Sequence, residues 1–299
     1  MKDRDWINNL EGLVDGSYDE IEAKVMNLIK SNPKIVKCIE QLNITDSELK
    51  DNLIEFLNIK ESLDNSDIYP WVYNVMRKNG ALVIKRSAAK NNYAKNITRK
   101  LNIILTEVSV TNPDYKLSKF HIPASRRKEL ITKINYVRNI LEKRKPLENN
   151  QNIYIYGSNG TGKTYIANAM VNSFASRGIS SAYIKLNDLF NYLKKKMSNS
   201  ISLNEIKSSL KNVSLLVIDD LGFEKHNEWF KYDFVYEILQ QRNANNKFTV
   251  LCSLLKPEDL ASYYRHIETN PSFSFKVESL IHEILQHFTP YNIDSNPLI

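Results

Sequence analysis

The sequence predicts an α/β protein, in which a parallel sheet has helices on both faces and a small α+β domain precedes it. Two observations predict this architecture. Residues 1–100 combine helical hydrophobic spacing with one strong hairpin signal. From residue 146 onward, short apolar segments alternate with helical segments, which is the pattern of a parallel sheet covered on both faces.

The N-terminal domain, residues 1–100, is predicted to begin with helices. Apolar residues recur at helical spacing over Ile21–Ile29, and the capping-box pattern Thr-Asp-Ser-Glu opens a further helix over 45–57. Two short strands follow, Trp71–Val75 and Ala81–Ile84, with Asn79-Gly80 between them. An Asn-Gly pair between apolar strands is a strong hairpin signal, so we expect an antiparallel pair.

The segment 146–299 is predicted to form the second domain. The predicted strands are Ile153–Tyr156, Ser181–Ile184, Leu215–Ile218 and Phe248–Ser253, and the predicted helices are Thr164–Ser176, Asp188–Lys196 and Trp229–Gln241. Because parallel strands are joined by helical crossovers, this order predicts a sheet that is buried between two helical layers.

The basic charge of the chain is concentrated in its middle. The formal net charge of +7 excludes an acidic, solvating protein, and it favours an anionic partner. Residues 85–145 hold sixteen Lys and Arg against four Asp and Glu, a net charge of +12, so the rest of the chain carries −5. We therefore expect residues 101–145 to form a basic linker and helix between the two domains.

Cysteine usage and hydropathy indicate the compartment. Two thiols, Cys38 and Cys252, are too few for a disulfide framework or a four-thiolate zinc site. No secretory signal is visible, and no apolar stretch is long enough to span a membrane. We expect a cytoplasmic protein without a membrane partner.

A glycine-rich segment after the first strand of the second domain carries the strongest chemical signal. Three of the eight glycines in the chain fall within six positions, in the pattern G-x-x-x-x-G-K-T between a strand and a helix. In such a P-loop the backbone N–H groups surround phosphates, the lysine pairs with the β/γ-phosphates and the threonine hydroxyl binds Mg²⁺. We expect ATP and Mg²⁺ to be bound by Gly157, Ser158, Asn159, Gly160, Thr161, Gly162, Lys163 and Thr164.

An apolar strand that ends in two acids forms a second motif, 56 residues after the P-loop lysine. Leu215–Ile218 is followed by Asp219 and Asp220, which is the Walker B arrangement. We expect Asp219 to hold Mg²⁺, directly or through water, and Asp220 to polarise the attacking water. With Lys163, these acids are the candidate catalytic residues.

These motifs resemble those of the bacterial replicative helicase loaders of the DnaI/DnaC type, a branch of the AAA+ ATPases shared with IstB-like transposition helpers. The resemblance rests on the P-loop and on Leu216–Glu224, followed by Trp229 and Ile238–Arg242. It implies an AAA+ fold for the second domain, which would bind ATP and single-stranded DNA. It also implies an N-terminal domain that grips the DnaB-type hexameric helicase, as in the DnaI form.

The sequence departs from this family in its expected zinc site. The family's N-terminal domain usually holds zinc through a cysteine cluster, but here Cys38 is the only thiol in that domain, so we expect no zinc. His226, His266, His282 and His287 also lack acid or thiol partners at metal-ligand spacing.

Two further departures concern the residues that sense ATP in this family. The sensor strand usually ends in Ser-Asn, but here Ser253 is followed by Leu254, which cannot hydrogen-bond a phosphate, so Ser253 is the sensor candidate. The family's arginine that reaches a neighbour's ATP is missing from Val277–Phe288. Arg242 is a trans-acting candidate, and the alternative is a solvated arginine at a helix end. We therefore expect weak hydrolysis of ATP to ADP and phosphate.

Basic residues interleaved with aromatic residues in the middle of the chain fit a track for single-stranded DNA. The candidates are Lys85, Arg86, Lys90, Lys95, Arg99, Lys100, Arg126–Lys128 and Lys143–Lys145, with a second cluster at Lys194–Lys196. The alternative is a solvated linker and a charged outer helix face, neither of which needs a ligand.

The resemblance implies a helicase loader of the primosome, which acts in the initiation or restart of DNA replication and assembles with further copies of itself on ATP. An IstB-like transposition helper is one alternative, although such proteins usually have a short helical N-terminus. A second alternative is a nucleotide-binding adaptor of the helicase with little hydrolysis, which the missing asparagine and arginine keep open. A replication initiator is disfavoured, because the sequence after Ser253 is too short for a helix-turn-helix domain.

Overall fold

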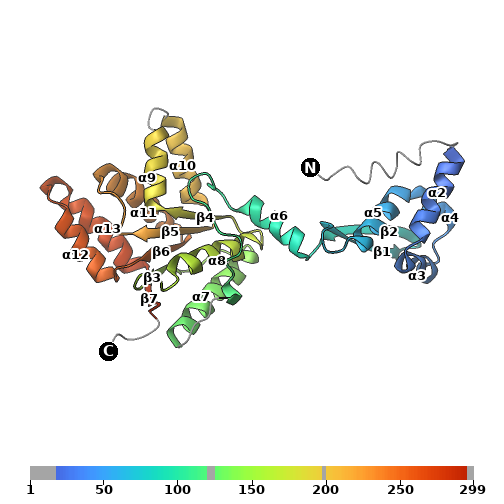
Figure 1. Cartoon of the computed structure of the whole chain (residues 1–299), viewed down its shortest axis with the longest axis horizontal. Helices are drawn as coiled ribbons and strands as arrows, with labels where there is room; N and C mark the ends of the chain where they lie inside the picture. Colours follow the sequence, from blue (N-terminus) through green and yellow to red (C-terminus); the bar gives the residue numbers. More distant parts are fainter. Residues whose placement is uncertain (1–17, 120–124, 197–199, 295–299) are drawn as a thin grey trace. The chain divides into compact units, whose positions relative to one another are not determined.

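The computed structural model describes residues 18–119, 125–196 and 200–294 (Figure 1). The chain divides into two compact units, Met1–Asn96 and Ile97–Ile299. The first seventeen residues of the predicted N-terminal domain lie outside the described residues. Within the described part of the chain, every helix is too short or too polar to cross a bilayer.

In the described part of the N-terminal unit, residues 18–96, four helices pack against a hairpin. Its elements are α2 (Tyr18–Lys30), α3 (Pro33–Leu42), α4 (Asp46–Asp51), α5 (Leu53–Asp64), β1 (Trp71–Lys78) and β2 (Ala81–Ala88). The strands pair antiparallel across Asn79-Gly80, which confirms the predicted hairpin and extends both strands. Thr45 and Glu48 form the predicted capping box, but Asn52 divides the helix predicted over 45–57 into α4 and α5.

One arginine of β1 joins three parts of the N-terminal unit. The Arg77 guanidinium donates to both carboxylate oxygens of Glu48, at 2.7 and 2.8 Å, and to the carbonyl oxygens of Leu42, Asn43 and Gly80. These hydrogen bonds lower the pKa of Glu48 to about 2. The end of α3, the cap of α4 and the hairpin turn are therefore connected around one side chain, beside an apolar cluster that includes Ile29, Ile35, Leu49 and Phe56.

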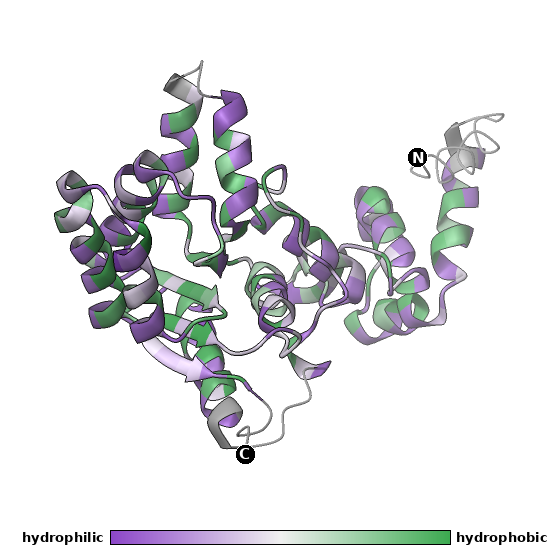
Figure 2. Ribbon diagram, turned by 60° about the vertical axis from the view of Figure 1, so that its left-hand side comes forward, coloured by the Kyte–Doolittle hydropathy of each residue, from purple (hydrophilic) through white to green (hydrophobic). Residues whose placement is uncertain are grey.

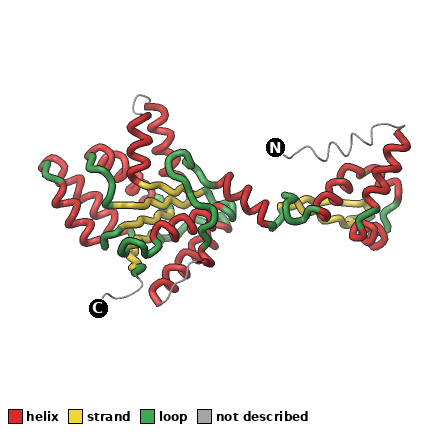
Figure 3. The backbone as a smooth tube through the Cα atoms, in the orientation of Figure 1, coloured by secondary structure: helices red, strands yellow, loops and turns green. Residues whose placement is uncertain are grey.

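The larger unit is a parallel sheet between two helical layers (Figure 3). Its strands are β3 (Ile153–Tyr156), β4 (Ser181–Lys185), β5 (Leu215–Leu221), β6 (Phe248–Ser253) and β7 (Thr289–Asn292), in the order β4-β5-β6-β3-β7. Its helices are α6 (Asn92–Asn102, at the unit boundary), η1 (Leu117–Lys119), α7 (Ser125–Glu142), α8 (Lys163–Ala175), α9 (Leu186–Lys196), α10 (Ser200–Asn212), η2 (Trp229–Val235), α11 (Tyr236–Ala244), α12 (Pro257–Ile267), η3 (Pro271–Phe273) and α13 (Ser274–His287).

The sheet buries both faces, as its near-continuous apolar strands predict. Alternate strand residues divide between two cores. On one face Ile153, Val217 and Val250 pack with α7 and α8; on the other, Ile184 and Ile218 pack with α9 to α13. Figure 2 shows the inner strands coloured as hydrophobic. The four strands predicted from sequence are confirmed, whereas β7 is an addition. The helix predicted over Trp229–Gln241 opens with the π-helical η2.

The basic segment 101–145 is part of the larger unit, so the predicted linker is corrected. Leu130, Ile134 and Val137 of α7 are completely buried and pack in the core beneath the sheet. Ile103 forms a parallel bridge to Ser181 at the edge of β4. The helix predicted within this segment is present as α7, and its apolar residues, which follow one another at helical spacing, face the core.

Arg242 lies inside the larger unit, so it is not a solvent-facing trans-acting cation. Its side chain is 0% exposed. Its Nε donates to the Thr249 hydroxyl at 2.9 Å, and its terminal nitrogens donate to the carbonyl oxygens of Leu210, Val213 and Phe248 at 2.7–2.8 Å. Burial lowers the pKa of Arg242 to about 9, and the carbonyl groups at the end of α10 compensate the buried charge. Both sequence-based interpretations of Arg242 were wrong.

We predict that Arg242→Ala lowers the free energy of unfolding of the larger unit by about 3–5 kcal/mol, because it leaves several buried acceptors unpaired. Arg265→Ala is the matched control, since Arg265 is half exposed and pairs with Glu278 at the surface. We expect little change for the control. Urea denaturation of the full chain measures both values, and equal effects of the two substitutions would contradict the buried role of Arg242.

Candidate functional site

The P-loop connects β3 to α8, and its glycines meet specific backbone requirements. Gly162 is the N-cap of α8 and has a φ of 94°, in the left-handed region that favours glycine. A Cβ atom at Gly157 would lie 2.8 Å from Oδ1 of Asp294, so a larger residue here would displace the Asp294 side chain from the loop. The loop therefore presents its backbone at the N-terminus of a thirteen-residue helix, where anions are favoured.

Lys163 folds over the loop that it follows. Its Nζ donates to the carbonyl oxygens of Gly157 and Ser158, at 2.7 and 2.8 Å. Burial lowers the pKa of Lys163. The ammonium group has three N–H donors, and these two carbonyl groups hold it above the loop backbone. Lys163 is thus positioned beside the surface where phosphates would bind.

Asp219 is the buried centre of the site. Its Oδ2 accepts hydrogen bonds from the hydroxyl groups of Thr164 and Tyr183, both at 2.8 Å, and its Oδ1 accepts from the backbone N–H of Asp220 at 3.0 Å. The residue is 1% exposed, and burial raises the pKa of its carboxyl group. A divalent cation at this point would favour the charged carboxylate, so the predicted Mg²⁺ ligands Thr164 and Asp219 fit such an ion.

Asp220 stands at an irregularity at the end of β5. Its φ is 61°, and the register of β5 against β6 shifts between Ile218 and Leu221. Its carboxylate remains 44% exposed and lies 3.4 Å from the Lys185 ammonium group. A β-bulge turns side chains away from the regular alternation, and here it gives the two adjacent acids different surroundings. Asp219 is buried, whereas Asp220 is accessible to water.

Ser253, the sensor candidate, hydrogen-bonds within the sheet. Its hydroxyl donates to the Leu221 carbonyl oxygen at 2.7 Å and accepts from the Leu255 N–H at 3.1 Å. The residue is 1% exposed. Its single hydroxyl hydrogen therefore holds the end of β5 against the end of β6 in this arrangement.

Sequence reasoning missed two residues of the site. Tyr183 belongs to a predicted strand, but only the pairing of β4 with β5 brings its hydroxyl to Asp219. Asp294 follows β7, and its Oδ1 accepts a hydrogen bond from the backbone N–H of Ser158 at 2.7 Å. The signal for Tyr183 was a polar aromatic residue in an otherwise apolar strand, whereas Asp294 had none, because β7 was not predicted.

The segment after β5 is held by a second buried acid, Glu224. Its Oε1 accepts from the Tyr264 hydroxyl at 2.7 Å and lies 3.3 Å from the Lys231 ammonium group, and its Oε2 accepts from the Gly222 N–H at 2.7 Å. The Glu224 and Lys231 side chains are almost completely buried. This network joins the segment after the Walker B strand to η2 and α12.

The basic candidates are divided between the two units. Lys85 and Arg86 lie on β2, where the Arg86 guanidinium is 4.4 Å from the centre of the Trp71 ring. Arg99 lies in the larger unit and donates to the Asn172 side chain at 3.3 Å. The side chains of residues 126 and 127 lie outside the described residues. Lys194–Lys196 end α9, as predicted.

Comparisons with known proteins find similarity in the part of the chain that contains this site. Residues 137–265 match the family described as "IstB-like ATP binding protein". The chain is 23% identical to the replicative helicase loader DnaI of Bacillus subtilis (strain 168), over 98% of this chain and 89% of that protein. It is 30% identical to the replicative helicase loader DnaC of Escherichia coli (strain K12) over 105 residues, which are 35% of this chain and 42% of that protein.

A crystal structure of DnaI superposes with a TM-score of 0.51 and 24% identity, and the match covers 66% of this chain and 97% of that one. The strand order β4-β5-β6-β3-β7, with the P-loop after β3 and the paired acids at the end of β5, belongs to the same fold. The chain thus resembles the DnaI helicase loader in sequence over nearly its whole length, and its larger unit has the α/β AAA+ fold of the DnaI structure.

Proposed function

We propose that this protein loads a replicative hexameric helicase onto single-stranded DNA, in a step controlled by ATP. The observation that carries the proposal is the extent of the similarity to DnaI, which spans 98% of this chain and therefore both structural units. A transposition helper or another AAA+ ATPase accounts for the larger unit alone. The separate helix–hairpin unit favours a loader, in which one unit binds the helicase and the other binds nucleotide.

Nucleotide binding is assigned to the P-loop and the end of β5. Lys163 would exchange its two carbonyl partners for phosphate oxygens, while Thr164 and Asp219 would hold the accompanying Mg²⁺. When bound, Mg²⁺ neutralises the charge of the phosphates. Asp220, which is accessible to water at the same strand end, would polarise the attacking water. The Thr164–Asp219 hydrogen bond supports this assignment, because it brings both ion ligands together.

We propose that hydrolysis is weak. The Ser253 hydroxyl is occupied by the Leu221 carbonyl group, and Leu254 has no polar group to offer a phosphate. The Arg242 side chain is buried in the core, so it does not reach another molecule. ATP would then act mainly through occupancy, by ordering the loop and changing affinity for DNA, for the helicase and for further copies of this chain. An adaptor that binds nucleotide without turnover is the second candidate, which the occupied Ser253 hydroxyl favours.

The helicase contact is assigned to the N-terminal unit. Large apolar side chains are exposed in one short stretch of this unit: Ile68 is 59%, Trp71 is 38% and Val72 is 52% exposed. Neighbouring apolar residues at a surface are typical of protein-binding sites. Single-stranded DNA is assigned to the basic residues of the larger unit, where Arg99 and the end of α9 are candidates.

We predict that the purified host helicase co-purifies with this protein, and that Lys163→Ala removes the effect of ATP on the association without abolishing it. Val72→Asp should weaken the association at least tenfold, because it places a charge in an apolar contact. Val110→Asp is the matched control, since Val110 is 84% exposed and lies in the other unit. Biolayer interferometry measures the affinity of the helicase for the wild-type chain and for each variant. If the wild-type chain does not associate with the helicase, the loader proposal is contradicted.

We predict slow ATP turnover, which helicase or single-stranded DNA stimulates. Radiolabelled ATP hydrolysis by the purified protein, with and without these partners, measures it. Asp220→Asn should abolish the stimulated rate and preserve ATP binding, because Asp220 is placed to act on water rather than on phosphate. Rapid hydrolysis by the protein alone would contradict weak, partner-dependent turnover, and no turnover under any condition would favour the adaptor.

We predict that Asp294→Asn tightens ATP binding about three- to tenfold, because it removes a negative charge beside the P-loop. Asparagine retains the oxygen that accepts from Ser158, so the loop keeps its conformation. Asp259→Asn, an exposed acid of α12, is the control and should leave the affinity unchanged. Titration calorimetry with a non-hydrolysable ATP analogue measures the affinity of the wild type and of both variants. Unchanged or weaker binding by Asp294→Asn would contradict the repulsion between the Asp294 carboxylate and the ATP phosphates.

A further inference from the structure

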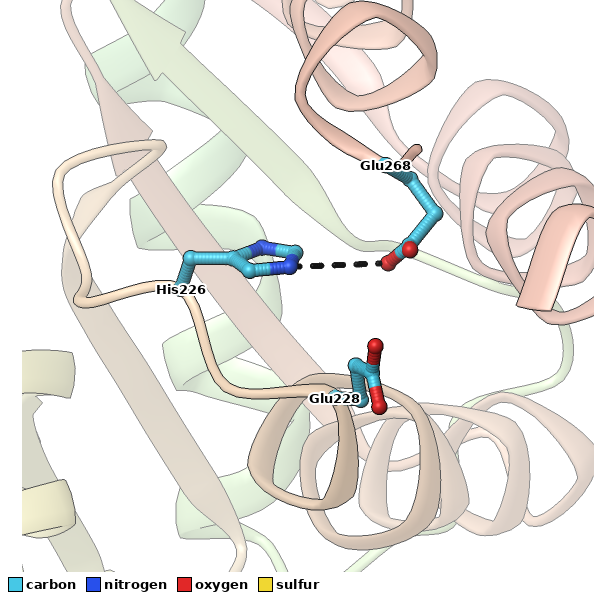
Figure 4. A group of neighbouring side chains, drawn as sticks. All are labelled: His226, Glu228 and Glu268. Carbon is cyan, nitrogen blue, oxygen red and sulfur yellow. Dashed lines mark ion pairs between the residues drawn. The ribbon is translucent and has the colours of Figure 1, made fainter. Parts of the chain in front are cut away.

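Three side chains converge where the segment after β5 meets the end of α12 (Figure 4). His226 and Glu228 belong to the segment between β5 and η2, and Glu268 directly follows α12. One ligand atom of each lies within 4.8 Å of the other two, and Nε2 of His226 is 3.7 Å from Oε2 of Glu268. The sequence indicated no metal partner for His226, because Glu268 is 42 residues away along the chain.

Glu268 also has a buried carboxylate oxygen that accepts no hydrogen bond from the described residues. Its side chain is only 3% exposed, and one oxygen, Oε1, accepts the backbone N–H of Asn270 at 3.1 Å. The other oxygen, Oε2, is buried and has no hydrogen-bond donor among the described residues. A buried carboxylate oxygen without a donor is unfavourable unless a cation or a proton accompanies it.

The donor set points to the class of ligand. One imidazole nitrogen and two carboxylate oxygens suit Zn²⁺, whereas Mg²⁺ and Ca²⁺ prefer oxygen ligands alone. Bonds of about 2.1 Å place neighbouring ligands of a tetrahedral ion roughly 3.4 Å apart, close to the 3.7 Å between His226 and Glu268. His226 is 41% exposed, which leaves a path for the ion and room for a water ligand.

We infer that His226, Glu228 and Glu268 form a binding site for one divalent transition-metal ion of the Zn²⁺ type. The Asn270 N–H orients Glu268 toward this site, as a hydrogen bond to a ligand commonly does. The ion joins the segment that follows Asp219 and Asp220 to the end of α12. The Glu224–Tyr264 hydrogen bond joins the same two parts of the fold from within the core. The metal therefore stabilises the larger unit at the surface.

The test uses the full chain, stripped of metal with a chelator and free of nucleotide. We expect one Zn²⁺ ion to bind in titration calorimetry and to raise the melting temperature, since a ligand of the folded state alone stabilises it. His226→Ala and Glu268→Gln should each weaken this binding by at least ten- to hundredfold, the loss that even an orienting partner causes. His266→Ala is the matched control, since His266 is an exposed histidine of α12. It should bind Zn²⁺ as the wild type does.

The absorption spectrum of bound Co²⁺ distinguishes binding at this site from binding at the two cysteine thiols or at the proposed Mg²⁺ ligands. Co²⁺ in the wild-type chain should give the visible absorption of a nitrogen–oxygen site without a thiolate charge-transfer band, and His226→Ala should lose it. If Glu268→Gln fails to fold, the exposed His226→Ala variant still decides. Zn²⁺ binding that is unchanged in His226→Ala would overturn the site, as would equally tight binding of Mg²⁺, or a thiolate band.

Discussion

The hydrogen bonds of Thr164 and Tyr183 to a single oxygen of Asp219 connect the three elements on which the site depends. Thr164 opens α8, Tyr183 lies in β4 and Asp219 ends β5, so the P-loop helix and two strands meet at one carboxylate. The two-faced burial of the sheet places that carboxylate away from water, and burial raises its pKa. Two hydroxyl donors stabilise the buried acid, so a cation bound there, as proposed above, would change the hydrogen bonds that join these three elements.

Two polar residues that the sequence singled out as candidates for sensing or activating ATP serve the frame of the sheet rather than the nucleotide. Ser253 ties β6 to β5, and Arg242 caps the carbonyl end of α10 and reaches the start of β6. Both candidates for sensing or activating ATP are therefore used in packing, which is consistent with a protein that responds to ATP binding more than it consumes ATP. Glu224 continues this pattern, because its buried pair with Lys231 orders the segment that leads from the acids to α12.

Local patterns in the sequence predicted what depends on near neighbours along the chain. The hairpin, the capping box at Thr45, the four predicted strands of the larger sheet and the P-loop follow from residues within one element or one turn. What the sequence could not predict depends on distant pairing. The hydroxyl of Tyr183 reaches Asp219 only through the order of strands, and Arg242 looks like a surface residue until α10 packs over it. The helix in the basic segment was predicted, but its burial beneath the sheet was not, because that burial depends on packing against a distant part of the chain.

The central claim, that this chain places a ring-shaped helicase on DNA, is tested most directly on a closed circle of single-stranded DNA carrying a labelled annealed strand. A ring helicase enters a linear strand from its end, but a circle offers no end, so entry there requires an opened ring. With ATP present throughout to drive the helicase, displacement of the strand from the circle should require this protein, whereas displacement from a linear substrate should not. Displacement from the circle at the same rate with and without this protein would contradict the account.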